Sequence, residues 1–220
     1  MFELDHLFVC ADVGAPEAER LVAFGLTEGD PNVHHGQGTA NRRFFFRNAF
    51  LELLWVSDPV EVQTELVRPT QLWSRWSQRK SGTSPFGVGL RPTRPGSAEI
   101  PFPSWEYRPP YLPSPLAIHV GEGVPLSEPL WFFLGFGRRP DASGGPRRQP
   151  LEHHVGFQEV THVRLTSPSV DSPSAVASVV LRGAVTLGSS PEYLLEMTFD
   201  SGAQGSHKDF RPVLPLVFRW

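Results

Sequence analysis

The sequence predicts a mixed α+β fold built mainly from short strands. Residues 2–56 read in the order strand, helix, strand, strand, strand, with apolar side chains at the matching spacings. Residues 160–196 echo this segment, because Val-Thr-His-Val-Arg-Leu follows the pattern of Leu-Asp-His-Leu-Phe-Val at 4–9 and a later strand again carries a glutamate. Many of the 23 prolines fall between Pro85 and Pro150, where they disfavour long helices.

The first segment places one helix among its strands. The helix is expected at 15–25, because Pro16 suits a first turn and Gly25 suits the residue that follows a helix. Asn48-Ala49 predicts a tight turn between two strands. The strands are expected at 2–10, 42–47 and 50–56, with a short strand or loop at 26–35.

The rest of the chain predicts two further sets of elements. Apolar residues at helical spacing predict a helix at 69–80. A basic, Gly/Pro-rich linker at 135–150 divides the chain into a region at 1–134 and a C-terminal segment at 151–220. The expected strands are 86–91, 105–111, 116–121, 159–165, 184–188 and 193–199, with a helix at 172–182 and a loop in place of a helix at 94–100.

Composition and charge exclude several classes of function. A formal net charge of −3 and scattered basic residues give no electrostatic case for binding nucleic acid or a membrane surface. The arginine pairs at 138–139 and 147–148 could bind an anion, but they are assigned to a solvated loop. The single cysteine, Cys10, is expected to be a small buried residue, and it excludes an internal disulfide. No apolar run approaches the roughly 20 residues of a membrane span and no signal-peptide pattern opens the chain, so a cytoplasmic location is expected.

Two of the predicted strands each carry one side chain that can bind a metal. His6 lies among the apolar residues of 2–10, and Glu52 lies among those of 50–56. A carboxylate buried without a partner costs several kcal/mol, so Glu52 needs a cation or a hydrogen-bond donor beside it. A metal ion meets this need, and so does a hydrogen bond from His6 in a metal-free core.

Three motifs in this order and spacing resemble the vicinal oxygen chelate superfamily, in its glyoxalase-like branch. They are Leu4-Asp5-His6, Gly38-Thr39-Ala40-Asn41 and Phe50-Leu51-Glu52-Leu53. The resemblance covers 2–56, is weaker over 84–120 and reappears over 157–200. It implies paired βαβββ modules that form a curled mixed β-sheet cup, with an additional C-terminal βαββ segment packed on them.

The resemblance also implies where a divalent metal ion would be held. Ligands in the superfamily project from the first and last strands of each module, which points to His6 and Glu52 as ligands for Fe, Mn, Zn, Ni or Co. His119, on the strand taken to close the second module, supplies the third ligand in one arrangement. In the other, His162 and Glu196 of the C-terminal segment complete a four-ligand set. The strand that opens the second module carries no ligand, and this departure weakens the expectation of a complete metal site.

Two functions follow from the resemblance. The first is a metal-dependent lyase, isomerase or dioxygenase that chelates adjacent oxygens of a small oxygen-rich molecule, with Glu52, or alternatively Glu196, as the catalytic base. The second is a non-catalytic small-molecule binding or drug-sequestering protein of the same fold that lacks a metal. The candidate substrate contacts are Asn41 and Arg43 near the rim of the cup and Trp105 and Arg108 on a later strand.

Two smaller expectations concern the surface of the protein. The histidine pairs at 34–35 and 153–154 are assigned to surface loops. A homodimer is expected, because two modules and a partial third leave a sheet edge that needs cover.

Overall fold

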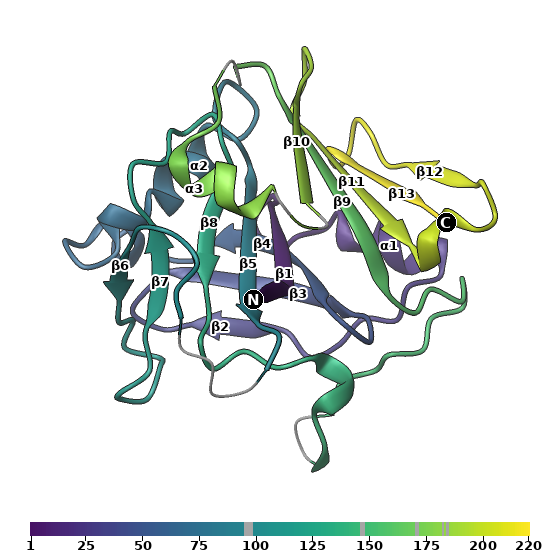
Figure 1. Ribbon diagram of the computed structural model, residues 1–220, viewed down its shortest axis with the longest axis horizontal. Coiled ribbons are helices and arrows are strands. Elements are labelled where there is room, and N and C mark those ends of the chain that lie inside the picture. The colour runs from purple at the N-terminus through teal and green to yellow at the C-terminus, as the bar shows by residue number, and fades with distance from the viewer. Residues whose placement is uncertain (95–98, 146–147, 170–171, 182, 184) are drawn as a thin grey trace.

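The chain folds into two β-sheets, one of eight strands and one of five (Figure 1). The computed structural model describes residues 1–94, 99–145, 148–169, 172–181, 183 and 185–220. Strands predominate within these ranges, so the predicted mixed α+β class is confirmed. The helices described there are short, and none has the length and the apolar run that crossing a membrane requires.

The first βαβββ module builds one half of the larger sheet. It comprises β1 (Phe2–Cys10), α1 (Ala18–Phe24), β2 (Asn32–His34), β3 (Thr39–Phe45) and β4 (Phe50–Val56). β1 and β4 pair in parallel, and β3 and then β2 follow as antiparallel neighbours. β1 and β4 have the predicted bounds, because each carries apolar side chains on both of its faces. α1 ends at Gly25, where a φ of 110° favours glycine.

The second module repeats this pattern without its helix. It comprises β5 (Phe86–Pro92), β6 (Ser104–Tyr107), β7 (Ile118–Gly121) and β8 (Leu130–Phe133). β5 and β8 pair in parallel as β1 and β4 do, and β7 and then β6 follow as antiparallel neighbours. The prediction that the strand with His119 closes the module is wrong, because that strand is β7 and the module closes with β8, which the sequence pattern does not reveal.

Short helical turns connect the two modules. They are η1 (Glu61–Gln63), η2 (Arg68–Thr70) and α2 (Leu72–Ser77). The helix predicted at 69–80 is therefore a 3₁₀ turn followed by a short α-helix. The loop predicted at 94–100 falls largely on residues outside the described ranges.

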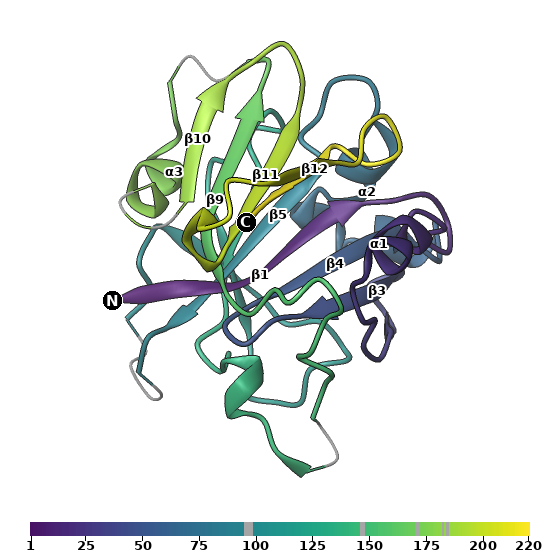
Figure 2. The same ribbon diagram turned by 90° about the vertical axis from the view of Figure 1, so that its right-hand side faces the viewer.

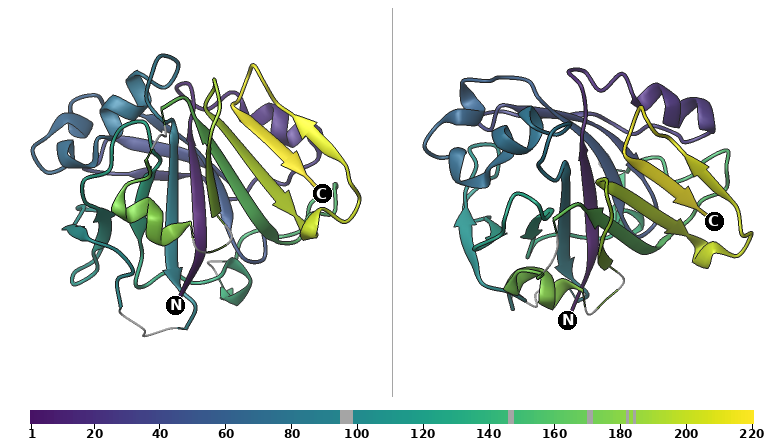
Figure 3. Two further views of the ribbon diagram at one scale, coloured as in Figure 1. Left: turned by 45° about the horizontal axis from the view of Figure 1, so that its top comes forward. Right: turned by 90° about the horizontal axis from the view of Figure 1, so that it is seen from above.

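The two modules join along β1 and β5, which pair in antiparallel fashion. The strand order of the larger sheet is β2-β3-β4-β1-β5-β8-β7-β6. The sheet curls so that its two ends approach each other (Figure 3). Beyond β6, the ring of Tyr111 lies 4.9 Å from the ring of His34 on β2. The predicted half-barrel is confirmed, and its concave face holds the site described below.

The C-terminal segment forms the second sheet. It comprises β9 (Val160–Ser167), α3 (Ala175–Val180), β10 (Val185–Ser189), β11 (Leu194–Phe199), η5 (Asp200–Gly202), β12 (His207–Asp209) and β13 (Leu216–Arg219), and η3 (Pro140–Ala142) precedes it. The strand order is β10-β9-β11-β13-β12. β9 is parallel to β10 and antiparallel to β11. The predicted βαββ order is present, but the strand pairing differs from that of the two modules. Residues 182 and 184, at the ends of the predicted helix and strand, lie outside the described ranges.

The second sheet lies against the larger sheet (Figure 2). One apolar core joins it to the convex face of that sheet. Leu7, Leu51 and Val88 pack in the same cluster as Leu165 and Phe218. α3 lies over β8 (Figure 1), and its N-cap Ser174 donates a hydrogen bond from Oγ to Glu128, just before β8, at 2.7 Å. The C-terminal segment thus supplies a helix to the module that has none of its own.

Candidate functional site

A cavity of about 220 Å³, here called the cup, opens on the concave face of the larger sheet. Its volume lies below the roughly 300–1,000 Å³ typical of pockets for drug-sized ligands, so it suits a small molecule. Phe8 from β1, and Leu130 and Phe132 from β8, give it a largely apolar wall. The polar side chains that line it are His6, Asn32, His34, Gln37, Arg43, Glu52, Thr70, Tyr107 and Tyr111.

His6 is held in the cup by contacts on several sides. A register shift between Leu4 and His6 interrupts the pairing of β1 with β5, and the Asp5 carboxylate contacts Nδ1 of His6 at 2.7 Å. The imidazole stacks on Phe50 at 4.4 Å and meets the edge of Phe132 at 5.1 Å. Burial alone would lower the pKa of His6, but the carboxylates of Glu52 and Asp5 outweigh it, and the pKa is raised.

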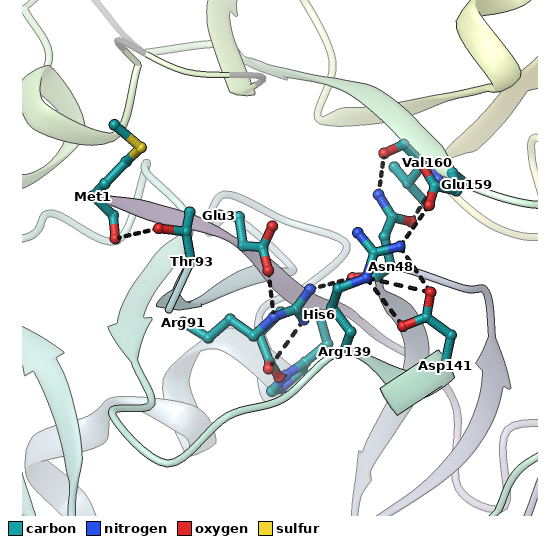
Figure 4. A network of polar contacts seen from close by, with 11 residues as sticks. Met1, Glu3, His6, Asn48, Arg91, Thr93, Arg139, Asp141, Glu159 and Val160 are labelled. Atoms are coloured by element: carbon teal, nitrogen blue, oxygen red, sulfur yellow. Dashed lines mark hydrogen bonds and ion pairs between the residues drawn. The ribbon is translucent and has the colours of Figure 1, made fainter. Parts of the chain in front are cut away.

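A buried polar network fixes Asp5 and connects it to the second sheet (Figure 4). Arg91 on β5 donates hydrogen bonds to Asp5 at 3.3 Å, to Glu3 at 3.0 Å and to the carbonyl of Asn48 at 2.6 Å. The Asn48 side chain in turn bonds both the N–H and the C=O of Val160 at the start of β9. The orientation of His6 is therefore tied to the packing of the two sheets.

Glu52 is the carboxylate inside the cup, and only 6% of its surface is exposed. It lies opposite Phe8 on one side and opposite Arg43 on the other, so that its field acts on both His6 and Arg43. No described residue donates a hydrogen bond to its carboxylate. Burial lowers the pKa of Arg43, and the Glu52 charge partly offsets this. Glu52 is thus balanced by neighbouring charge and remains free to accept a hydrogen bond from a ligand.

Residues 4–97, which span β1 to β5, match the family model described as a glyoxalase-like domain. This segment is a glyoxalase-like domain of the vicinal oxygen chelate superfamily. Solved structures of 55 chains match the fold, among them the crystal structure of a hypothetical protein from Staphylococcus aureus. That structure has a TM-score of 0.50 and 8% sequence identity, with 100% of this chain and 98% of that chain covered, and the likeness concerns the fold alone. No curated protein matches this chain.

At the equivalent positions of the two modules, only the first module carries side chains that can bind a metal. The two modules meet at the paired residues Leu7 and Val88. Gly87, the residue before Val88, is therefore the counterpart of His6, the residue before Leu7. Glu52 lies beside Phe8, and Phe132 lies beside Gly89 in the same relation, which makes Phe132 the counterpart of Glu52. In the described part of the chain no group of three or more His, Cys, Asp or Glu residues could hold a metal ion. The cup is lined by the imidazoles of His6 and His34 and the carboxylate of Glu52, but these three do not form such a group, so its donors do not fit a resident metal.

The structure does not bring the other predicted metal ligands to the cup. Ile118 and Val120 of β7 line the cup, and His119 between them points to the opposite face of the strand. On the second sheet, Glu196 is already paired with Arg164 and Arg219. His162, on the same sheet, contacts the hydroxyl of Thr186 at 3.1 Å.

The predicted substrate contacts divide between the cup and the surface. Arg43 lines the cup, and Asn41 lies two residues earlier on the same face of β3, fully buried, with its Nδ2 unpartnered among the described residues. Trp105 lines a neighbouring surface hollow beside Thr70 and Leu130. Arg108 is exposed and bonds Glu106 and the carbonyl of Pro115. Of the four predicted contacts, Arg43 lines the cup and Asn41 is buried beside it on β3.

The sequence left the role of Tyr107 open between a ligand contact and a core residue, and it did not place His34 in the cup. Tyr107 alternates with Trp105 along β6, and aromatic residues at alternate strand positions commonly belong to a core. Tyr107 lines the cup because the sheet curls. The assignment of His34 to a surface loop was wrong: the ring is buried, burial lowers its pKa, and Nδ1 contacts Thr39 at 2.9 Å. His153 is also buried, between the N–H of Thr27 and the carbonyl of Phe45.

Proposed function

We propose that the cup of this glyoxalase-like protein binds a small, largely apolar organic molecule without a resident metal ion. The observation that carries the proposal is the pair of residues at the second module's ligand positions, Gly87 and Phe132. A Cβ atom built on Gly87 would lie 2.0 Å from Cε1 of Phe8, so the Phe8 ring fills the space that a ligating side chain would need. That half of the cup offers aromatic surface to a ligand.

The cup combines the two features that a small-molecule site needs. When a ligand packs against its aromatic and aliphatic wall, the binding free energy improves by about 25 cal/mol for each Å² of apolar surface removed from water. A few fixed polar groups then orient the ligand, among them Glu52 as an acceptor and Arg43 as a donor. The hydroxyl of Tyr107 adds a further group, because the residue is 2% exposed and the hydroxyl has no hydrogen-bond partner among the described residues.

A metal-dependent lyase, isomerase or dioxygenase is the second candidate, and one observation favours it. Asp5 holds Nδ1 of His6, which leaves Nε2 as the ring nitrogen available to a ligand. Metal-ligating histidines are commonly oriented by a carboxylate in this way. The candidate requires that substrate or water supply every ligand beyond His6 and Glu52.

Fluorescence titration with methyl 6-hydroxy-2-naphthoate, a neutral two-ring probe, tests the proposal. Leu112 lines the cup from a loop and is half-buried, so Leu112→Trp is expected to occupy the cavity and weaken binding about tenfold or more. Leu66→Trp, the same change at a loop residue that is 45% exposed, is the matched control and should bind as the wild type does. Equal affinity in all three folded proteins, or no binding by the wild type, would refute the cup as the binding site.

A further inference from the structure

A second hollow borders the cup. Arg43 and Phe50 line both the cup and this outer groove of about 400 Å³. These two side chains therefore stand where the two hollows meet, and a ligand in the cup lies next to the groove. The remaining residues of the groove are Asp30, Phe45, Arg138, Pro140, Ser143 and Gln149.

The outer groove carries an excess of positive charge. Its carboxylate, Asp30, is engaged by Gln149, which bonds both its backbone N–H and its side chain at 2.9 Å and 3.0 Å. Arg138 is exposed and forms no ion pair within the described ranges, whereas the adjacent Arg139 is paired with Asp141 and Glu159. The groove thus contains two guanidinium groups, of Arg43 and Arg138, and one carboxylate, which already accepts a hydrogen bond from Gln149.

Arg43 is held in place but retains donors for a ligand. Its Nε donates to the carbonyl of Asp30 at 2.7 Å, and its guanidinium lies 5.1 Å from the centre of the Phe45 ring. Both contacts fix the side chain while its Nη groups remain available. A guanidinium fixed in this way is suited to bind a carboxylate with two parallel hydrogen bonds.

At Glu52 the cup is suited to a hydrogen-bond donor on the ligand. Glu52 is buried and accepts no hydrogen bond from a described residue, so a donor on the ligand would stabilise it. Tyr107 lines the same cavity with an unpartnered buried hydroxyl. Arg43, directly opposite Glu52 on the neighbouring strand, lines both the cup and the groove, and the apolar wall that begins at Phe8 lies on the other side of Glu52.

We infer that the natural ligand is a flat apolar acid of one or two rings, with a hydrogen-bond donor at Glu52 and a carboxylate at Arg43 and Arg138. This inference rests on the proposed binding function of the cup. It goes beyond that function by assigning the chemical class of the ligand and by giving Arg138 a role in recognition. The solvated loop expected at 138–139 is in this view the outer end of the site.

Comparison of 6-hydroxy-2-naphthoic acid with its methyl ester tests the ligand class. The two probes share the rings and the hydroxyl and differ only in the carboxylate. The affinity for the ester therefore measures binding in the cup without any contribution from the carboxylate. The wild type is expected to bind the acid about tenfold more tightly than the ester, as removal of a charge-assisted hydrogen bond implies. Arg138→Gln should reduce this preference while leaving the affinity for the ester close to that of the wild type, because Arg138 lines the groove and not the cup. Arg43→Gln should reduce the preference and also weaken the ester, because Arg43 lines both hollows.

Arg20→Gln is the matched control, because Arg20 is an exposed arginine on α1 that lines neither the cup nor the groove. It should keep the full preference for the acid. If the ester binds in the cup and the acid binds no better, the carboxylate inference is overturned and the proposed function stands. If neither probe binds, or Leu112→Trp affects neither, the proposed function fails and the inference fails with it.

Discussion

His6 of β1 and Gly87 of β5 occupy equivalent positions in the two modules, on either side of the paired residues Leu7 and Val88. The equivalence is structural but not chemical, since one side carries an imidazole and the other carries no side chain. The Phe8 ring lies where a side chain on Gly87 would begin. The cup is therefore polar on the side of the first module and aromatic on the side of the second.

Substitution of Gly87 should destabilise the protein. In Gly87→Ala the new Cβ meets the Phe8 ring, and we expect the free energy of unfolding to fall by about 1–3 kcal/mol, as overpacking does in other cores. Urea denaturation measures the change. Gly188→Ala on β10 is the control, since nothing lies within 4 Å of its Cβ position, and it should be close to neutral. A Gly87→Ala protein as stable as this control would contradict the packing of Phe8.

Removal of the Tyr107 hydroxyl should leave the free protein at least as stable. The group is buried without a partner, so Tyr107→Phe removes a desolvated polar atom and should raise the free energy of unfolding by up to about 1 kcal/mol. In Tyr193→Phe, the lost hydroxyl donates to the carbonyl of Gly82 at 3.3 Å, and we expect a small loss of stability. If Tyr107→Phe is the less stable of the two, the hydroxyl has a partner in the folded protein.

Asn48 should stabilise the contact between the two sheets. Its amide forms two hydrogen bonds with the backbone of Val160, at 2.7 Å and 2.9 Å, and Asn48→Ala leaves these backbone groups without them. We expect a loss of about 2–3 kcal/mol in the free energy of unfolding. Asn32→Ala, at an exposed asparagine of β2, controls for the substitution itself and should cost little. Equal losses in the two variants would argue against this connection.

Stability should fall as the solution becomes acidic, in part because of His153. Burial lowers the pKa of His153 below its ordinary value of 6.5, so the unfolded state takes up a proton before the folded state does. The stabilisation is complete above the unfolded pKa and is lost as the pH falls towards the folded pKa. We expect His153→Gln to lose less in melting temperature than the wild type between about pH 7.5 and about pH 5.5. His154→Gln, at the exposed neighbour, is the comparison, and a loss in His153→Gln as large as in the wild type would disprove the assignment.

The sequence could predict the strands that carry His6 and Glu52, because both are long and apolar on two faces. It could not predict β8, whose four residues lie in a proline-rich region. As a result, the strand with His119 was wrongly predicted to close the second module. The Phe8 ring over Gly87 depends on the register of β1 against β5, which no local pattern encodes. His34 was missed for a similar reason, since only the approach of the two sheet ends buries it.

The predicted homodimer stays a prediction. In this chain the second sheet packs its apolar face on the convex side of the larger sheet, while β2 and β6 remain the edge strands of the half-barrel. Sedimentation of the purified protein measures its oligomeric state. A dimer supports the expected cover of a sheet edge, and a monomer contradicts it.

The central claim is that the cup binds its ligand without a metal ion. The most direct test is the dissociation constant of methyl 6-hydroxy-2-naphthoate before and after dialysis against a chelator, with metal content followed by elemental analysis. We predict the same constant in both samples and no gain on adding Fe, Mn, Zn, Ni or Co. Binding that disappears with the metal and returns when a stoichiometric divalent ion is restored would contradict the claim and favour the metal-dependent enzyme.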